Sequence, residues 1–106
     1  MKEYSYSSPY GGTCTIRLSK ASYAHNGNLA VHAEYYDKEF NAWLPYGNVT
    51  VNLGNKLPAQ YAYVDENNFL GVLDWLVSNG IAEFTGKYGY SGFCQYPLVK
   101  FNESAF

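Results

Sequence analysis

The feature that most constrains this chain is residues 65–81, DENNFLGVLDWLVSNGI, because no other segment has a helical pattern of apolar residues. Large apolar side chains recur there at i, i+3, i+4 and i+7, the spacing of one helical face. The residues at this spacing are Phe69, Val72, Leu73 and Leu76, and Leu70 and Val77 widen the stripe. A helix of about three turns is marginal in water on its own. It must therefore pack on other parts of the chain.

Both ends of this helix carry boundary signals. Asp65, Asn67 or Asn68 can accept hydrogen bonds from the free N–H groups of a first helical turn, and the pattern does not choose among the three. Gly80 can adopt the left-handed conformation that ends many helices, and Ile81 lies where an apolar contact accompanies such an ending. The sequence thus predicts a helix over about residues 66–79.

The rest of the chain consists of short runs that alternate between apolar and polar residues, separated by turn residues, as in antiparallel sheets. We expect strands at about residues 13–19, 29–36, 40–44, 49–53, 59–64, 83–88 and 93–101. The expected fold class is α+β: a mainly antiparallel sheet of about five to six strands with the helix packed on one face.

Length and composition place these elements in a single domain of residues 1–106. A hydrophobic fraction of 47% with 15% charged residues argues against disorder, although we expect residues 1–12 and 102–106 to be flexible ends. No apolar run is long enough to cross a bilayer, and the first residues lack the apolar segment of a secretory signal. We therefore expect a cytoplasmic protein with Cys14 and Cys94 as free thiols.

The residue pattern gives little support for catalytic or metal chemistry. Cys94 is the best candidate nucleophile, but a thiol needs a nearby base, and neither His25 nor His32 is visibly paired with a carboxylate. An inert buried thiol is the favoured interpretation, because free Cys is among the most buried residue types. Two His and two Cys at these spacings do not match a zinc site, and the glycines of residues 86–92 lack the Lys and helix that follow a phosphate loop. We expect no catalytic residue, no metal and no cofactor.

An acidic, tyrosine-rich surface is the more informative feature. No Lys or Arg occurs between Lys56 and Lys87, whereas carboxylates do, and the chain has 12 tyrosines, more than a small core can bury. Tyr is common at protein interfaces, and an acidic surface can dock on a basic partner. Tyrosines also line ordinary sheets, and acidic surfaces often need no partner. The candidate partner-binding residues are Asp65, Glu66, Asp74, Trp75, Glu83, Tyr88 and Tyr90.

Several segments resemble a family of small uncharacterised bacterial proteins, classed as a domain of unknown function. The segments that carry the resemblance are residues 26–30 (NGNLA), 49–53 (VTVNL), 57–58 (LP), 62–65 with 67–68 (AYVDxNN), 79–83 with 85–86 (NGIAExTG) and 89–94 with 96–97 (GYSGFCxYP). Proteins of this family occur in Gram-positive and gut bacteria, often on phages or other mobile elements. The resemblance implies no catalytic residue; it implies a setting in which small acidic proteins bind and disable host machinery.

These observations favour a small non-enzymatic protein-binding module from a phage or mobile element. An anti-defence inhibitor that resembles an anti-CRISPR protein is its sharpest form, with a basic nuclease or CRISPR effector of the host as partner. One alternative is a cysteine-dependent hydrolase that uses Cys94. Another is a single-stranded nucleic-acid-binding protein that uses surface aromatics, which the net charge of −2 disfavours.

Overall fold

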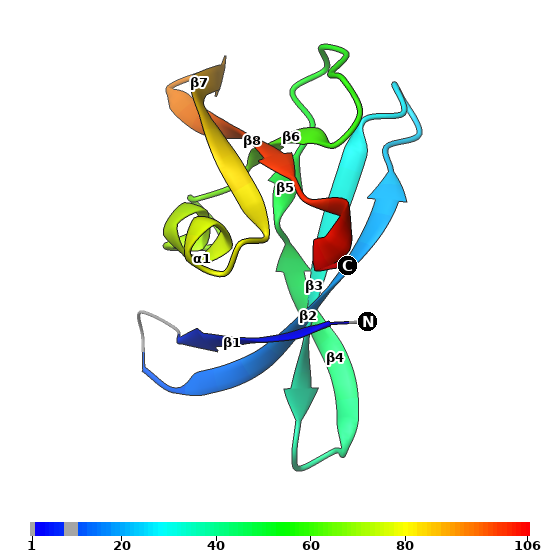
Figure 1. Ribbon diagram of the computed structural model, residues 1–106, viewed down its shortest axis with the longest axis vertical. Helices are drawn as coiled ribbons and strands as arrows, with labels where there is room; N and C mark the ends of the chain where they lie inside the picture. The colour runs from blue at the N-terminus through cyan, green and yellow to red at the C-terminus, as the bar shows by residue number, and fades with distance from the viewer. Residues whose placement is uncertain (1, 8–10) are drawn as a thin grey trace.

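The computed structural model describes residues 2–7 and 11–106 (Figure 1). Its strands are β1 (Glu3–Ser7), β2 (Thr13–Ser22), β3 (Leu29–Asp37), β4 (Ala42–Asn48), β5 (Thr50–Val51), β6 (Tyr61–Val64), β7 (Ala82–Ser91) and β8 (Cys94–Phe101). A short α-helix, α1 (Val72–Ser78), and a 3-10 turn, η1 (Glu103–Ala105), complete the fold. The antiparallel α+β class is confirmed.

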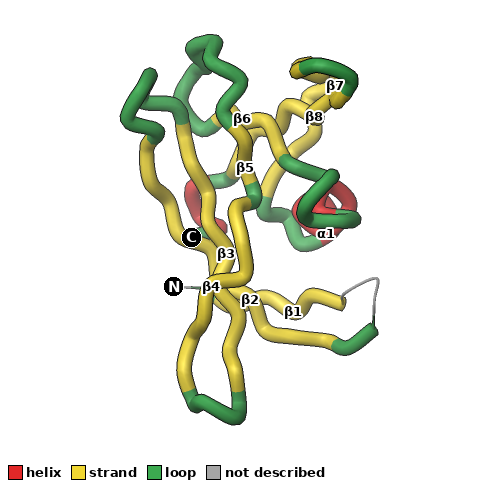
Figure 2. Tube along the Cα trace, turned by 180° about the vertical axis from the view of Figure 1, so that it is seen from behind, coloured by secondary structure: helices red, strands yellow, loops and turns green. Residues whose placement is uncertain are grey.

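The prediction of one sheet with about five to six strands is wrong, because the strands form two four-stranded sheets. Their orders are β1-β2-β3-β4 and β5-β6-β8-β7, with every neighbouring pair antiparallel. Figure 2 shows how the first sheet continues into the second through the short β5.

The chain passes from one sheet to the other at Val49, a fully buried residue between β4 and β5. The Val49 N–H donates to the carbonyl of Val31 on β3, and the Val49 carbonyl accepts from the N–H of Asp65 after β6, both at 2.9 Å. Residues 49–53 were predicted as one strand, but only Thr50 and Val51 pair with β6. The alternation of apolar and polar side chains does not reveal to which sheet a strand belongs, because strands of both sheets show the same alternation.

The core lies between the two sheets and α1, and its side chains come from the faces that the alternation predicts. Ile16 and Leu18 of β2 and Val31 of β3 are almost fully buried from one sheet. The other sheet and the helical region contribute Val64, Phe69, Val72, Leu76, Ile81, Val99 and Phe101. These side chains stabilise the fold by roughly 1.5–3 kcal/mol each before entropy is subtracted.

The helix begins later than the sequence predicts and ends about where the sequence predicts. It begins at Val72 because Gly71 adopts a left-handed conformation with φ 74°, so the residues before Gly71 cannot continue a right-handed helix into it. Asp65 instead closes a turn: its Oδ1 accepts from the N–H groups of Asn67 (3.1 Å) and Asn68 (3.2 Å).

At the other end, Gly80 has φ 67°. Its N–H donates to the carbonyl of Val77, and that of Ile81 donates to the carbonyl of Leu76. This pair of bonds is the Schellman ending, so the predicted cap is confirmed.

The N-terminal strand β1 was not expected from the sequence. It pairs with β2 and brings Tyr4 and Tyr6 against the helical region, where the Tyr6 hydroxyl donates to the carbonyl of Leu70 at 2.9 Å. At the C-terminus, Ala105 of η1 is buried and its carbonyl accepts from the Tyr4 hydroxyl. Residues 1 and 8–10 of the expected flexible end lie outside the described residues.

The β3–β4 hairpin projects at the lower end of the molecule in Figure 1. Its second strand begins at Ala42 rather than at residue 40, because residues 38–41 form the turn and Asn41 has φ 49°. Phe40 lies at this turn and is 72% exposed.

Candidate protein-binding surface

The outer half of the β7–β8 hairpin projects beyond the rest of its sheet. β6 pairs with β8 only at Leu98, Val99 and Lys100, so residues 88–97 form a two-stranded ribbon, which we call the ribbon. Figure 1 shows the ribbon reaching past α1 at the upper end of the molecule. A two-stranded hairpin is marginally stable by itself, so its position depends on the contacts at its base.

Four large aromatic side chains of this hairpin face solvent. Tyr90 is 69% exposed and Phe93, in the two-residue turn with Gly92, is fully exposed at 111%. Phe84 and Tyr88 are 39% and 41% exposed, and their rings meet edge to face with centroids 5.4 Å apart. Exposed apolar groups gathered on one element mark interaction sites more often than scattered ones do.

Close packing at Gly89 fixes the direction of the ribbon. A Cβ atom on Gly89 would lie 2.5 Å from Cε1 of Tyr63 and 2.6 Å from Cδ1 of Leu53. Next to it, three residues of β7, Thr85 to Lys87, bulge opposite β8, and the Thr85 hydroxyl donates to the carbonyl of Leu98 at 2.7 Å. The glycine and the bulge together hold the ribbon against Tyr63 and Leu53.

The predicted acidic residues lie on three different elements. Asp65 and Glu66 belong to the turn between β6 and α1, and Asp74 is exposed on α1. Glu83 on β7 pairs in register with Lys100 on β8. Since opposite charges on neighbouring strands attract each other, Glu83 has a positive neighbour that the sequence spacing did not reveal.

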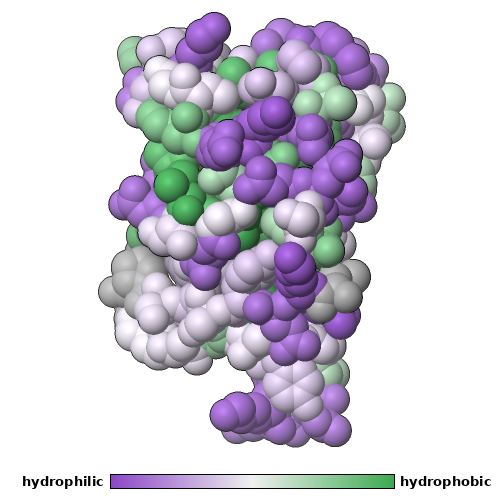
Figure 3. All heavy atoms as spheres, viewed as in Figure 1, coloured by the Kyte–Doolittle hydropathy of each residue, from purple (hydrophilic) through white to green (hydrophobic). Residues whose placement is uncertain are grey.

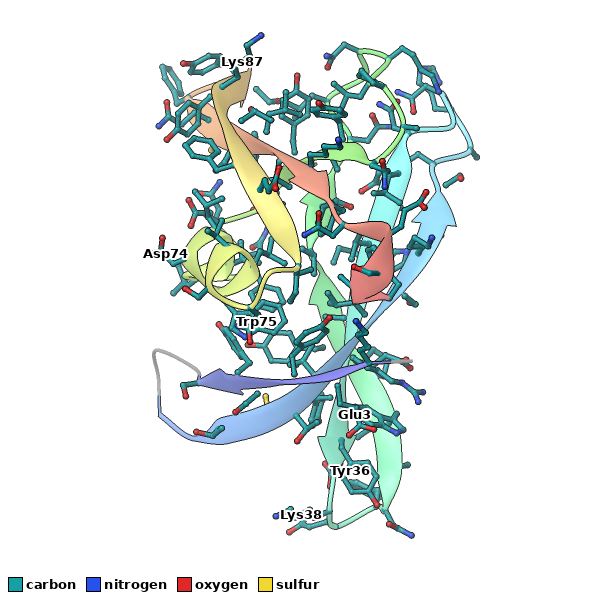
Figure 4. The ribbon with its side chains drawn as sticks, viewed as in Figure 1. Glu3, Tyr36, Lys38, Asp74, Trp75 and Lys87 are labelled. Carbon is teal, nitrogen blue, oxygen red and sulfur yellow. The ribbon has the colours of Figure 1, made fainter. Side chains whose placement is uncertain are left out.

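Trp75, a predicted anchor for a partner, is half-buried among aromatic rings of its own chain. It meets Tyr4 and Tyr6 edge to face at 6.1 and 5.5 Å and stacks on Phe69 at 6.0 Å. Its Nε1–H donates to the carbonyl of Ser5 at 2.8 Å. Figure 4 shows Trp75 on the side of α1 that faces β1, whereas Asp74 points outwards.

The tyrosines predicted for the surface, Tyr88 and Tyr90, lie two positions apart on β7 and are both exposed. The structure therefore brings Tyr88 and Tyr90 together with two aromatics that sequence reasoning missed, Phe84 and Phe93. The position of Phe93 directly after Gly92 in a tight turn was the available signal, since side chains in such a turn cannot reach a core.

Cys94 is a free thiol at the start of β8 and is exposed, so the expected burial of this thiol is wrong. Burial raises the pKa of its neighbour Tyr96, and the Cys94 thiol and the Asp65 carboxylate raise that pKa further. His32 lies on β3, where its Nδ1 is hydrogen-bonded to Oδ1 of Asn48, and His25 is exposed in the β2–β3 turn.

Within residues 2–7 and 11–106, no three His, Cys, Asp or Glu side chains gather in a way that could hold a metal ion. The same residues contain no helix with the length and apolar character needed to cross a membrane.

The comparison with protein families decides the classification, because the model of a domain of unknown function, DUF4313, matches residues 17–106. The chain belongs to the DUF4313 family. Searches of curated proteins and of solved structures found no match. The expectation of an uncharacterised family is thus confirmed.

The DUF4313 match includes every candidate partner-binding residue and the whole ribbon. It begins within β2, so β1 and its contacts to Trp75 lie outside it. The aromatic hairpin therefore lies within the matched region, and β1 precedes it.

Proposed function

We propose that this chain is a non-enzymatic protein-binding module of a phage or other mobile element. In this proposal it acts as an anti-defence inhibitor and docks on a basic host protein such as a nuclease or CRISPR effector. The observation that carries the proposal is the exposure of Tyr90 and Phe93 at the end of a ribbon that is held in place by Gly89.

In this proposal the aromatic groups supply the binding energy, and the acidic groups accelerate association and select the partner. Buried aromatic anchors supply most of the binding energy in protein interfaces, and Phe93 has the greatest exposure among the described large apolar side chains. Charges at the rim mainly accelerate association and select the partner. The Asp65 carboxylate raises the pKa of Tyr96 in the ribbon, and Glu66 follows Asp65 in the same turn, so in this proposal both residues attract a basic surface towards the ribbon.

The neighbours of Cys94 favour a binding role over a cysteine hydrolase. A nucleophilic thiol is activated by a base, most often histidine, but His25 lies in the β2–β3 turn and His32 on β3 is bonded to Asn48, whereas the group beside Cys94 is the phenol of Tyr96.

Affinity capture from a lysate of a bacterial host, followed by binding kinetics with the captured protein, tests the proposal. We expect Asp65→Asn with Glu66→Gln to slow association and to weaken its dependence on salt. Phe93→Ser with Tyr90→Ser should accelerate dissociation. Asn at position 65 keeps an oxygen acceptor for the turn, so this change leaves the fold intact.

A matched control replaces Glu39 and Glu103 by Gln, which removes the same number of charges from other exposed positions. Equal capture by all variants, or no capture by the wild type, would refute the proposed surface. For the captured nuclease, the inhibitory activity is measured as the loss of DNA cleavage when the wild-type chain is added.

One observation favours a second candidate, the binding of single-stranded nucleic acid. Residues 84–102 contain Lys87 and Lys100 but no Asp or Glu, so the aromatic hairpin carries positive charge although the chain is acidic. Bases stack on exposed aromatic rings in such proteins. A mobility shift with a single-stranded oligonucleotide that weakens with salt and is lost in Tyr90→Ser would favour this function.

A further inference from the structure

Exposed apolar side chains occur on both α1 and β7, two elements that pack against each other. Three of them are Val77 on α1, 46% exposed, and the edge-to-face pair Phe84 and Tyr88 on β7. Figure 3 shows the apolar surface on the left of the molecule, over α1 and the adjoining part of β7. We call this surface the α1–β7 patch. It is distinct from the tip of the ribbon, where Tyr90 and Phe93 lie.

Opposite charges flank the α1–β7 patch. Asp74 points outwards from α1, and Lys87 lies in the bulge of β7, at the upper end of the molecule in Figure 4. The charges of the surrounding segments are separated along the sequence, although in the fold Lys100 pairs in register with Glu83. Residues 57–83 contain no Lys or Arg, and residues 84–102 contain no Asp or Glu. Asp74 and Lys87 thus place a negative and a positive charge on different sides of the apolar side chains.

A surface of this kind is complementary to itself. When two copies meet about a two-fold axis, both copies use the same surface. If residue i of the first copy contacts residue j of the second, then residue j of the first contacts residue i of the second, so every contact occurs twice. An axis through the apolar centre would place Lys87 of each copy against Asp74 of the other. Val77, Phe84 and Tyr88 of the two copies would then cover one another.

We propose that the α1–β7 patch binds a second copy of this chain in a two-fold symmetric dimer. The dimer does not depend on the proposed inhibitory function. It assigns Asp74 and Tyr88 to the contact between copies and leaves Asp65, Glu66, Tyr90 and Phe93 accessible on each copy. A dimer therefore presents two ribbon tips.

Sedimentation equilibrium of the purified chain in reducing buffer tests the proposal, since a reductant prevents disulfides through Cys94. We expect a reversible monomer–dimer equilibrium with a dissociation constant of about 1–100 μM, as for a small interface. Phe84→Ser should raise this constant at least about tenfold, because it removes an apolar contact twice per dimer. Phe40→Ser is the matched control: it removes an exposed phenylalanine outside the patch and should leave the dimer unchanged.

A charge exchange distinguishes this arrangement from unspecific association. Asp74→Lys and Lys87→Asp should each weaken the dimer about tenfold, because each places like charges together twice. The double variant should restore the dissociation constant to within about threefold of the wild type, since opposite charges meet again. A monomer at all concentrations up to about 500 μM would overturn the dimer. A double variant no tighter than the single ones, or equal effects of Phe84→Ser and Phe40→Ser, would overturn this interface.

Discussion

The Nε1–H of Trp75 on α1 donates a 2.8 Å hydrogen bond to the carbonyl oxygen of Ser5 on β1, a residue 70 positions earlier in the chain. Tyr4 and Tyr6, on either side of Ser5, both meet the indole ring edge to face. This contact joins the first strand of one sheet to the helix that packs beside the other sheet.

We expect Trp75→Phe to lower the free energy of unfolding by about 1 kcal/mol. The new ring keeps most of the aromatic packing, but the carbonyl of Ser5 loses its donor. Trp75→Ala, which also removes the ring, should cost about 3 kcal/mol. Urea unfolding followed by circular dichroism measures both values, and an unchanged stability of Trp75→Phe would show that the bond to Ser5 contributes nothing.

Gly89→Ala should destabilise the chain by roughly 1–3 kcal/mol, the usual cost of overpacking. The added methyl group would lie 2.5 Å from the Tyr63 ring and 2.6 Å from Leu53, so the ribbon has to move away from both. Gly47→Ala is the control, because a Cβ atom there has nothing within 4 Å. The two variants are compared by thermal unfolding, and similar melting temperatures would contradict the close approach at Gly89.

The stability of the chain should fall at alkaline pH because of Tyr6. Burial raises the pKa of Tyr6 to about 12, and Tyr46 and Cys14 add to the rise. An unfolded Tyr titrates near pH 10, so the folded state holds this proton more tightly. The contribution is complete below pH 10 and is lost as the pH rises from about 10 to about 12, by at most roughly 2–3 kcal/mol.

Tyr6→Phe separates this effect from the titration of other groups. It should be less stable than the wild type by about 1 kcal/mol at neutral pH, because the bond to the Leu70 carbonyl is lost. Its stability should then decline less steeply above pH 10. Unfolding in urea at a series of pH values measures the two slopes, and identical slopes would exclude Tyr6 as the titrating group.

Asn28→Ala should lower the free energy of unfolding by roughly 1–3 kcal/mol. Asn28 is only 5% exposed; its Nδ2 donates to the carbonyl of Asn55, and its Oδ1 accepts from the N–H of Leu57. The substitution leaves both backbone groups without their partner and releases the loop of residues 54–58 from the β2–β3 turn. Asn67→Ala, at an exposed position, is the control, and hydrogen exchange of the Leu57 amide reports on the loop directly.

Local rules predicted those parts of the fold that local sequence determines. The ending of α1 at Gly80 and Ile81 and the inward faces of β2 and β3 were predicted correctly, since each depends on residues a few positions apart. The start of α1 was not, because Phe69 continues the helical spacing although it lies before Gly71. A glycine inside an apolar stripe can be helical or left-handed, and only the tertiary contacts of Phe69 decide between the two.

The candidate site could be predicted only in part for a similar reason. Tyr88 and Tyr90 could be expected on a surface from their number and spacing, but the environment of Trp75 could not. Its neighbours Tyr4 and Tyr6 belong to β1, which is far away in the sequence. That segment also has too few apolar residues for its pattern to predict a strand. Likewise, Glu83 gains Lys100 as a neighbour only through the register of β7 with β8.

The position of Val49 has a consequence for how the molecule melts. The N–H group of Val49 is bonded to β3 of the first sheet, and its carbonyl group is bonded to Asp65, directly after β6 of the second sheet. The two sheets therefore cannot separate without breaking a hydrogen bond of this buried residue. We therefore expect both sheets to unfold in a single cooperative transition, with the amide proton of Val49 among the last to exchange with solvent.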